Sequence, residues 1–401
     1  MDESTASLGD DRTIGHRLQR IRNDRRKSLR VVAGLAGISA SHLCRLENGK
    51  RSLDSRSLVV ALANALQIAP SELTSLPIPA PGNGHTDSAI EVVRRTLMAV
   101  NHGRPGGLVL PVGVLRERVG ALMSARSGGD QELTGSELPG LIRDLHTTLG
   151  AGRDVAELLV LAVLLHTQAT IAWLRTAGAS VDLREQASLL ARRAAEECDT
   201  PTTRGLAAVG AAWVMVSAGA FDLAQAELDS VTVPTTTPES MQLAGFLALY
   251  RAEVAAADSR PGDVGPALAY ADDLAERTGE GNAYWLGFGP SNIGFCRTSV
   301  ALDLTDYDMA VAAAEGVNPR QNANPSRQAA YWVYYAGALT RLRRRQDDAV
   351  RALRRAELIL PHRVQRDPFA RELLAELVPR SKQDAVGREL RGMAYRAGLL
   401  V

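Results

Sequence analysis

Five residues near the start of the chain combine side chains that could recognise the edges of base pairs. They follow Ser39, a residue type that often caps a helix, and they are Ala40, Ser41, His42, Cys44 and Arg45. An arginine guanidinium can donate two parallel hydrogen bonds to O6 and N7 of guanine, and a serine hydroxyl can bond to several base edges. A short helix that exposes these side chains suits the major groove of DNA.

Residues 28–51, SLRVVAGLAGISASHLCRLENGKR, predict the two helices that would hold this surface outward. Gly37 supplies the positive φ of a tight turn between them, and Gly49 ends the second helix in the same way. Leu43 and Leu46 recur at helical spacing on the opposite side of the second helix, so we expect them to face inward.

The surrounding residues predict three more helices and a strongly basic segment. The helices cover about 14–23, 55–66 and 70–73. Between Arg12 and Arg56 the chain has twelve Arg and Lys residues against three Asp and Glu. The segment thus carries about +9, whereas the whole chain carries +1. A capped helical hairpin also occurs in domains that never meet DNA, but this charge favours a partner that carries phosphates.

This segment resembles the phage-repressor and Cro-type helix-turn-helix, the XRE family. The resemblance rests on Ile14-Gly15, SLRVVAGLAGIS, SHLCRLENGKR, LVVALANALQI and Ser71-Glu72-Leu73, and covers about 60 residues. It implies that Glu47 pairs with Arg22 and that Ala40, Ser41, Cys44 and Arg45 read bases, with His42 beside them. It places phosphate contacts near Ser28, Leu29, Asn48, Lys50 and Arg51. Ala40 and Cys44 replace hydrogen-bonding residues that are frequent in the family, which leaves most of the direct readout to Arg45.

The chain divides into four predicted parts. Residues 1–11 are acidic and polar, and we expect them to be disordered. Residues 12–76 form the helix-turn-helix domain. Residues 77–89 contain PIPAPGNGHTDS, whose prolines and glycines are typical of a linker. Residues 90–401 form a separate helical domain.

Residues 90–401 contain helical segments whose small residues recur at a regular interval. The alanines at 187, 224, 267, 310 and 349 are about 40 residues apart, a period typical of stacked helix pairs. The last unit resembles a tetratricopeptide repeat (TPR), although Val333, Thr340 and Arg344 depart from its pattern. We therefore predict an all-α protein, a helix-turn-helix domain followed by a TPR-like solenoid. An irregular helical bundle is the alternative.

Motifs for catalysis, cofactors and metals are missing from the sequence. It contains no GxxxxGK(S/T), GxSxG, HExxH or GxGxxG, and its three cysteines form no CxxC pair. His166 lies in an apolar segment and is expected to be a core residue. The apolar run 158–165 is too short to cross a bilayer. These observations predict a cytoplasmic protein that is not an enzyme, needs no cofactor or metal and does not enter a membrane.

Aromatic residues, scarce elsewhere, gather in two segments of the C-terminal domain. Together with nearby Asn and Arg side chains they could form a ligand pocket from Asn282, Trp285, Phe288, Asn292, Arg297, Arg327, Tyr331, Tyr334 and Tyr335. Alternatively, the aromatic rings fill gaps between repeats. For Asn322 and Asn324, which flank Ala323 and precede Pro325, a role in a turn is favoured.

The two parts together resemble the peptide-responsive quorum regulators of Gram-positive bacteria. That resemblance implies a bacterial, nucleoid-associated transcription regulator that binds double-stranded operator DNA. A single small helix-turn-helix buries too little surface for tight binding, so a homodimer is expected. A peptide or small-molecule effector would act through the helical domain. The alternative is a protein-interaction scaffold that its basic domain tethers to DNA.

Overall fold

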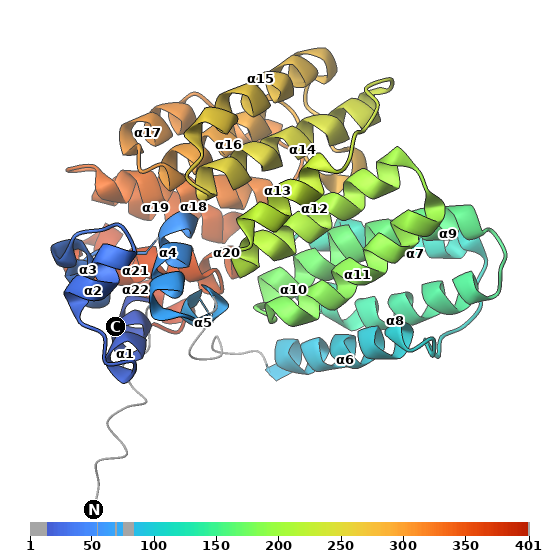
Figure 1. Ribbon diagram of the computed structural model, residues 1–401, viewed down its shortest axis with the longest axis horizontal. Coiled ribbons are helices and arrows are strands. Elements are labelled where there is room, and N and C mark those ends of the chain that lie inside the picture. Colours follow the sequence, from blue (N-terminus) through green and yellow to red (C-terminus); the bar gives the residue numbers. More distant parts are fainter. Residues whose placement is uncertain (1–13, 54, 69, 75–83, 400–401) are drawn as a thin grey trace, which may run out of the picture. The chain divides into compact units, whose positions relative to one another are not determined.

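The computed structural model describes residues 14–53, 55–68, 70–74 and 84–399. Over these residues the chain forms helices joined by short loops and contains no strand, which confirms the predicted all-α class (Figure 1). The predicted disordered residues 1–11 and residues 77–83 of the predicted linker lie outside the described residues. Residues 84–89, also assigned to the linker, form the first turns of α6 (Gly84–Asn101).

The helices fall into two compact units that are interleaved along the chain. Unit 1 comprises residues 1–82, 297–316 and 329–401, and unit 2 comprises residues 83–296 and 317–328. Two helices, α16 (Pro290–Asp303) and α18 (Pro325–Arg341), run from one unit into the other. The helix-turn-helix residues are thus grouped with the C-terminal helices of the chain.

Unit 1 begins with five helices that agree with the predicted ones to within about two residues at each end. They are α1 (Ile14–Asp24), α2 (Leu29–Leu35), α3 (Ala40–Glu47), α4 (Arg56–Leu66) and α5 (Pro70–Thr74). Besides its parts of α16 and α18, the unit contains α17 (Tyr307–Glu315), α19 (Gln346–Ile359), α20 (Pro361–Gln365), α21 (Pro368–Leu377), η4 (Val378–Arg380) and α22 (Ala385–Arg396). Phe369 of α21 packs against the apolar core of the first five helices.

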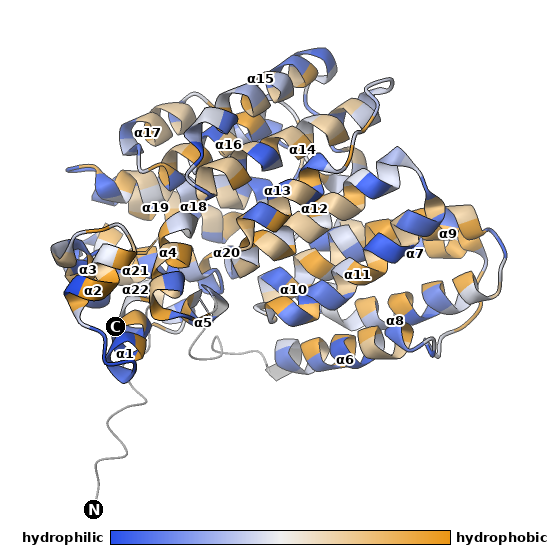
Figure 2. Cartoon of the chain, viewed as in Figure 1, coloured by the Kyte–Doolittle hydropathy of each residue, from blue (hydrophilic) through white to orange (hydrophobic). Residues whose placement is uncertain are grey.

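Unit 2 consists mainly of long helices packed in pairs, among which α11 pairs with α12 and α14 with α15. After α6 they are α7 (Val112–Ser127), α8 (Gln131–Gly150), α9 (Val155–Leu164), η1 (Leu165–Ile171), α10 (Ala172–Ala177), α11 (Val181–Cys198), α12 (Pro201–Ala218), α13 (Phe221–Asp229), α14 (Pro238–Ala257), α15 (Pro261–Thr278), η2 (Ala283–Trp285) and η3 (Pro319–Gln321). In α6 and α8, hydrophobic and hydrophilic residues form separate stripes (Figure 2). Such stripes are typical of helices that bury one side.

The regularly spaced alanines lie mostly in helix-packing positions. Ala187, Ala224, Ala310 and Ala349 are fully buried. On α15 the predicted alanine, Ala267, is half-buried, whereas Ala271, one turn further along, is fully buried. Small residues at such positions let neighbouring helices approach closely, as the predicted repeat requires.

The segment Val155–Ala177 is one continuous helical stretch with a π-helical centre, η1. It is longer than the apolar run predicted, and by length and composition alone it could cross a membrane. Buried core helices of soluble proteins pass the same test, and 78% of its most apolar window is buried. The segment is therefore weak support for a membrane span.

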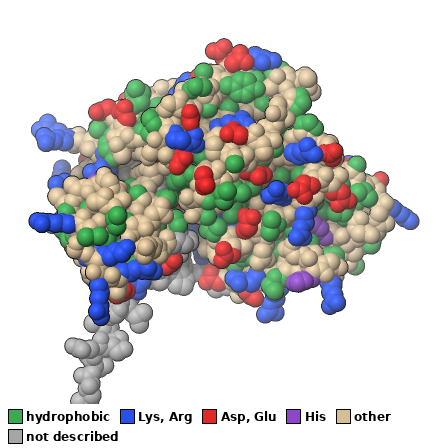
Figure 3. Space-filling view, in the orientation of Figure 1, with side chains coloured by type: hydrophobic (Ala, Val, Ile, Leu, Met, Phe, Trp, Pro, Cys, Tyr) green, Lys and Arg blue, Asp and Glu red, His purple; other side chains and the backbone are tan. Residues whose placement is uncertain are grey.

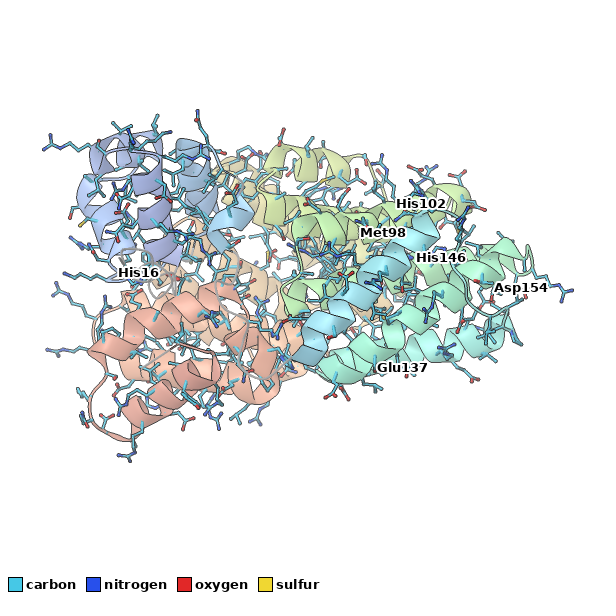
Figure 4. All side chains as sticks on the ribbon, turned by 90° about the horizontal axis from the view of Figure 1, so that it is seen from below. His16, Met98, His102, Glu137, His146 and Asp154 are labelled. Carbon is cyan, nitrogen blue, oxygen red and sulfur yellow. The ribbon has the colours of Figure 1, made fainter. Side chains whose placement is uncertain are left out.

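His166 in η1 is fully buried and faces a second histidine. Its Nε2 atom lies 2.8 Å from Nε2 of His146 on α8, which Figure 4 labels. Burial lowers the pKa of His146 to about 4, and burial together with the charge of His146 lowers that of His166. Both rings are therefore neutral at pH 7, as suits two core residues that share a hydrogen bond.

The crossing of α1 and α3 depends on a glycine. Gly15 lies where a methyl group would overlap the backbone carbonyl of Leu46. A larger residue would push α3 away from α1, and with it the side chains that α3 exposes.

Replacing Gly15→Ala should therefore lower the free energy of unfolding of unit 1 by about 1–3 kcal/mol, the usual cost of overpacking. Gly34→Ala is the matched control, because Gly34 is exposed in α2 and a methyl group there meets no atom within 4 Å. It should leave stability unchanged or raise it by up to about 1 kcal/mol. Urea unfolding of both variants measures the difference, and equal effects would contradict this account of the crossing.

Candidate nucleic-acid interface

Local hydrogen bonds set the geometry of α2, the turn and α3. The Ser28 hydroxyl accepts a hydrogen bond from the Val31 amide (3.3 Å), and the Ser39 hydroxyl accepts one from the His42 amide (3.1 Å), so both helices are capped. Gly37 has a φ of 68°, in the left-handed region that glycine tolerates best. These features are local, so the sequence could indicate them directly.

The two sides of α3 differ sharply in exposure. Leu43 and Leu46 are buried in the core of the helix-turn-helix. Ser41, Cys44 and Arg45 are exposed on the helix, one turn apart. Two other predicted base-reading residues, Ala40 and His42, are half-buried beside them. The structure thus places the five residues on one short helix, with three of them open to a partner.

His42 differs from its exposed neighbours. Its Nε2 atom is buried and has no hydrogen-bond partner among the described residues. Burial lowers the pKa of His42, and the charges of Arg51, Arg341 and Arg45 lower it further. At pH 7 the ring is therefore neutral and contributes no charge toward a phosphate backbone.

A buried ion pair joins α1 to the end of α3. Arg22 Nε lies 2.6 Å from Glu47 Oε1, and Arg22 Nη2 lies 2.8 Å from Oε2. Arg22 Nη1 also donates to the Lys27 carbonyl (3.0 Å), just before α2. The hydrogen bond with Glu47 raises the pKa of Arg22. This two-point pair, the one that the family resemblance implies, orients α3 against α1.

The residues expected to contact phosphate lie at the two ends of the helix pair. Ser28, Asn48 and Lys50 are exposed, and Leu29 and Arg51 are half-buried. Asn48 Nδ2 donates to the Cys44 carbonyl at 2.7 Å. The amides of Lys50 and Arg51 both donate to the Arg45 carbonyl (2.9 and 3.2 Å), which ties the loop after α3 to the helix.

Two of the counted basic residues serve the fold. Arg17 and Arg22 are buried, and Arg17 Nη1 donates to the Leu73 carbonyl at 3.1 Å. The exposed cations of the described helix-turn-helix are Arg20, Arg25, Arg26, Arg30, Arg45 and Lys50. Lys and Arg side chains project from this part of the molecule in Figure 3. The positive surface is thus smaller than the sequence count indicated.

The loop after α3 is held by the C-terminal helices of unit 1, which sequence reasoning did not anticipate. Glu376 Oε2 accepts a hydrogen bond from the Ser52 amide (2.5 Å). Arg341 donates to both carboxylate oxygens of Glu376 (2.8 and 2.9 Å) and to the Ser52 hydroxyl (2.6 Å). Arg380 donates to Glu376 (2.9 Å) and to the Lys50 carbonyl. We call Ser52, Arg341, Glu376 and Arg380 the loop clamp.

Glu376 remains ionised although it is buried. Burial raises its pKa, but the charge of Arg341 and the hydrogen bonds from Ser52 and Arg341 outweigh that effect, so the pKa lies below its usual value. A second link binds the same loop, because Arg51 Nη2 donates to the Tyr307 hydroxyl at 2.8 Å. The sequence did contain one indication that α21 makes polar contacts: FARELLAEL has two glutamates four residues apart among mostly apolar residues.

The first of these glutamates, Glu372, behaves differently. It accepts a hydrogen bond from the Ile14 amide at the start of α1 and is buried. Burial raises its pKa to about 8, against the lowering effects of the Ile14 amide, Arg371 and Arg17. Glu372 is therefore mostly protonated at pH 7 in the folded protein.

The nine predicted pocket residues are divided between the units. Asn282, Trp285, Phe288, Asn292 and Arg327 belong to unit 2, and Arg297, Tyr331, Tyr334 and Tyr335 belong to unit 1.

Within each unit, several of these residues have structural contacts. The fully buried Phe288 packs against Gly245, where a Cβ atom would overlap its ring. The Tyr331 hydroxyl donates to the Ala314 carbonyl (3.0 Å), and that of Tyr335 to Glu315 (2.9 Å). These contacts favour the alternative in which most of the rings fill gaps between helices.

Asn322 and Asn324 hold a neighbouring loop of unit 2. Asn322 Nδ2 donates to the Gly287 carbonyl (2.8 Å), and Asn324 Nδ2 donates to the Trp285 carbonyl (2.9 Å). Asn324 Oδ1 also accepts from the Ser326 amide (3.0 Å) at the start of α18. Both side chains are buried and support turns, the role that the sequence favoured.

The raised pKa of Glu372 predicts a pH dependence of stability. Because the folded pKa exceeds the unfolded one, the contribution of this group is complete below about pH 4.5 and is lost as the pH rises toward 8, by up to about 1.4 kcal/mol per pH unit. Glu372→Gln, which is always neutral, should remove this decline in urea unfolding between pH 5 and 8. Glu389→Gln on α22, a half-exposed group, should retain it. An unchanged slope in Glu372→Gln would mean that Glu372 is ionised when buried.

Comparison with known proteins supports the helix-turn-helix prediction for the first part of the chain. A family model described as a helix-turn-helix domain matches residues 13–76. Neither the curated proteins nor the solved structures give a match to this chain. The chain therefore contains an N-terminal helix-turn-helix domain, joined to a helical body.

Proposed function

We propose that this protein is a transcription regulator that binds operator DNA through α3 and is not an enzyme. One observation carries the proposal: α3 exposes Ser41, Cys44 and Arg45 within a matched helix-turn-helix domain, while caps and a buried ion pair fix its direction. Arg45 supplies the main base contact, with a guanine as its preferred partner. Lys50, Ser28 and Asn48 contact phosphates on either side.

The proposed regulator acts as a homodimer in the bacterial cytoplasm, and the domain is of the phage-repressor and Cro type. One small module buries too little surface for an operator affinity in the nanomolar range, so two copies of α3 would occupy half-sites on one face of the duplex. The half-sites would then be separated by a whole number of helical turns.

The loop clamp supports control of this binding by the helical body. Lys50 and Arg51, two proposed phosphate contacts, lie in the loop that Arg341, Glu376 and Arg380 hold. A peptide or small molecule that binds the body can change DNA affinity only if it prefers one of two arrangements of such a contact. The clamp is an element that a shift of α18 or α21 would alter.

The proposal is tested by selecting bound duplexes from a randomised DNA library with the full-length protein. We expect enrichment of a two-fold symmetric sequence, and an affinity that falls steeply with salt concentration. A folded protein that binds no duplex even at low ionic strength would refute the proposal. Equal binding to all sequences, with a partner protein that co-purifies in stoichiometric amount, would favour the tethered scaffold instead.

Arg45→Ala should relax the base preference at one position of each half-site and weaken operator binding by roughly 1–3 kcal/mol. Lys50→Ala is the matched control at a phosphate position and should weaken binding to all sequences about equally. Titrations of operator and single-base variants at fixed salt measure both effects. If Arg45→Ala retains the full sequence preference, Arg45 does not read a base.

A further inference from the structure

Four arginines on separate helices of unit 2 are near enough for their charges to act on one another. They are Arg126 at the end of α7, Arg175 on α10, Arg184 on α11 and Arg327 at the start of α18. Burial lowers the pKa of Arg126 and of Arg184. The charges of Arg175 and Arg327 lower that of Arg126 further, and the charge of Arg175 lowers that of Arg184 further. Like charges gathered in this way repel one another unless an anion lies among them.

Arg126 is the centre of this group. Its side chain is 8% exposed, and its Nε atom is buried without a hydrogen-bond partner. Within the described part of the chain, no side-chain hydrogen bond or ion pair involves its guanidinium. Burial lowers its pKa to about 10, so it still carries its charge at pH 7. A buried charge with no partner is costly to keep.

The other three arginines have neutral groups among their contacts. Arg184 Nη1 donates to the Ser217 hydroxyl at 3.0 Å. The guanidinium of Arg327 lies 4.6 Å from the centre of the Phe246 ring, and that of Arg175 lies 5.3 Å from the Trp213 ring. Stacking on a ring occupies the face of a guanidinium and not its edge, where the N–H groups lie.

Two buried arginines of unit 1 are paired with carboxylates, which makes the isolation of Arg126 informative. There Arg22 faces Glu47 and Arg341 faces Glu376, and in each pair both side chains are at most 10% exposed. Two other buried arginines of unit 1, Arg17 and Arg371, donate to backbone carbonyls instead, so each of them also has a hydrogen-bond partner. The charge of Arg126 has no such carboxylate among the described residues, as expected if a ligand supplies the negative charge.

Aromatic rings connect the two stacked arginines. The Tyr250 ring lies between the rings of Phe246 and Trp213. Its centre is 5.8 Å from that of Phe246 and 6.1 Å from that of Trp213. The Trp213 Nε1 atom is buried and unbonded among the described residues, as is Gln168 Nε2 in η1. The segment η1 packs against α7, α11 and α12, which carry Arg126, Arg184 and Trp213. Both of these atoms, Trp213 Nε1 and Gln168 Nε2, carry N–H groups that could donate a hydrogen bond to an anion.

We propose that unit 2 binds a small organic anion, a carboxylate or a phosphate with a flat apolar portion, at the arginine cluster Arg126, Arg175, Arg184 and Arg327. The guanidinium groups hold the anionic group, and the rings of Trp213, Tyr250 and Phe246 hold the apolar portion. Binding itself does not depend on DNA. The role of the anion as the effector rests on the proposed function.

Four probes test the site in the full-length protein: benzoate, phenyl phosphate, inorganic phosphate and the neutral benzamide. Thermal unfolding and calorimetry should show saturable binding of benzoate or phenyl phosphate, at least roughly tenfold tighter than inorganic phosphate or benzamide. The better of the two aromatic anions identifies the anionic group as carboxylate or phosphate. Failure of both to bind, or binding of benzamide as tight as that of the anions, overturns the proposal.

Arg126→Gln separates a ligand site from a structural role. Removing an unpaired buried charge should leave Tm of the free protein unchanged or higher, and should weaken probe binding roughly tenfold or more. A lower Tm with unchanged probe affinity would refute the assignment. Arg327→Met, which keeps an apolar chain over Phe246, should also lose binding and serves if Arg126→Gln fails to fold. Arg95→Gln, in an exposed pair with Glu91, is the control that changes neither measurement.

Measuring operator binding separately from probe binding distinguishes the proposed DNA-binding function from the proposed anion site. If the selected operator exists, Arg126→Gln should bind it with unchanged affinity but no longer respond to the probe. If no operator is found, probe binding still tests the arginine cluster. Probe binding without any effect on operator affinity supports the site and rejects its role as the effector site.

Discussion

The position of the loop after α3 in the helix-turn-helix depends on how the buried carboxylate of Glu376 is neutralised. Glu376 sits in a region without solvent, where an isolated negative charge would cost several kcal/mol. Arg341, Arg380 and the Ser52 amide together compensate it. Because Ser52 lies in the loop after α3, the same bonds that neutralise Glu376 also fix where that loop lies. The folding of the C-terminal helices and the placement of the candidate DNA-contacting loop therefore depend on the same hydrogen bonds.

Buried arginines are compensated by carboxylates at two places in unit 1, whereas Arg126 in unit 2 is not. In unit 1, acids face Arg22 and Arg341, so both charges are neutralised within the fold. In unit 2, Arg126 and Arg184 are equally buried, and other arginines are the charges that act on them. A protein that had to stabilise only its fold would gain by replacing such residues with apolar ones. Their presence is understandable if the cluster exists to attract a negative charge from outside the chain.

The sequence predicted those features whose causes are local. Ser28, Gly37 and Ser39 specify caps and a turn within a few residues, so the bounds of α2 and α3 followed directly. The pocket prediction relied on aromatic composition, which does not show which helix a ring packs against. Tyr331 bonds to the Ala314 carbonyl, a contact that exists only after α17 and α18 pack together. Nothing in the sequence indicated that Arg126 is buried without an ionic partner, because the absence of a carboxylate beside it depends on tertiary packing.

One helix relates the proposed anion site to the loop clamp. α18 carries Arg327 in its first turn and Arg341 at its last residue, about four turns apart along one continuous backbone. An α-helix is stiff over this length, so a rotation or axial shift that brings Arg327 toward an anion must also move Arg341. Arg341 bonds to both Glu376 and Ser52, so the movement would change the loop that carries Lys50 and Arg51. Under the two proposals, the covalent continuity of α18 is the route through which anion binding would reach the loop clamp.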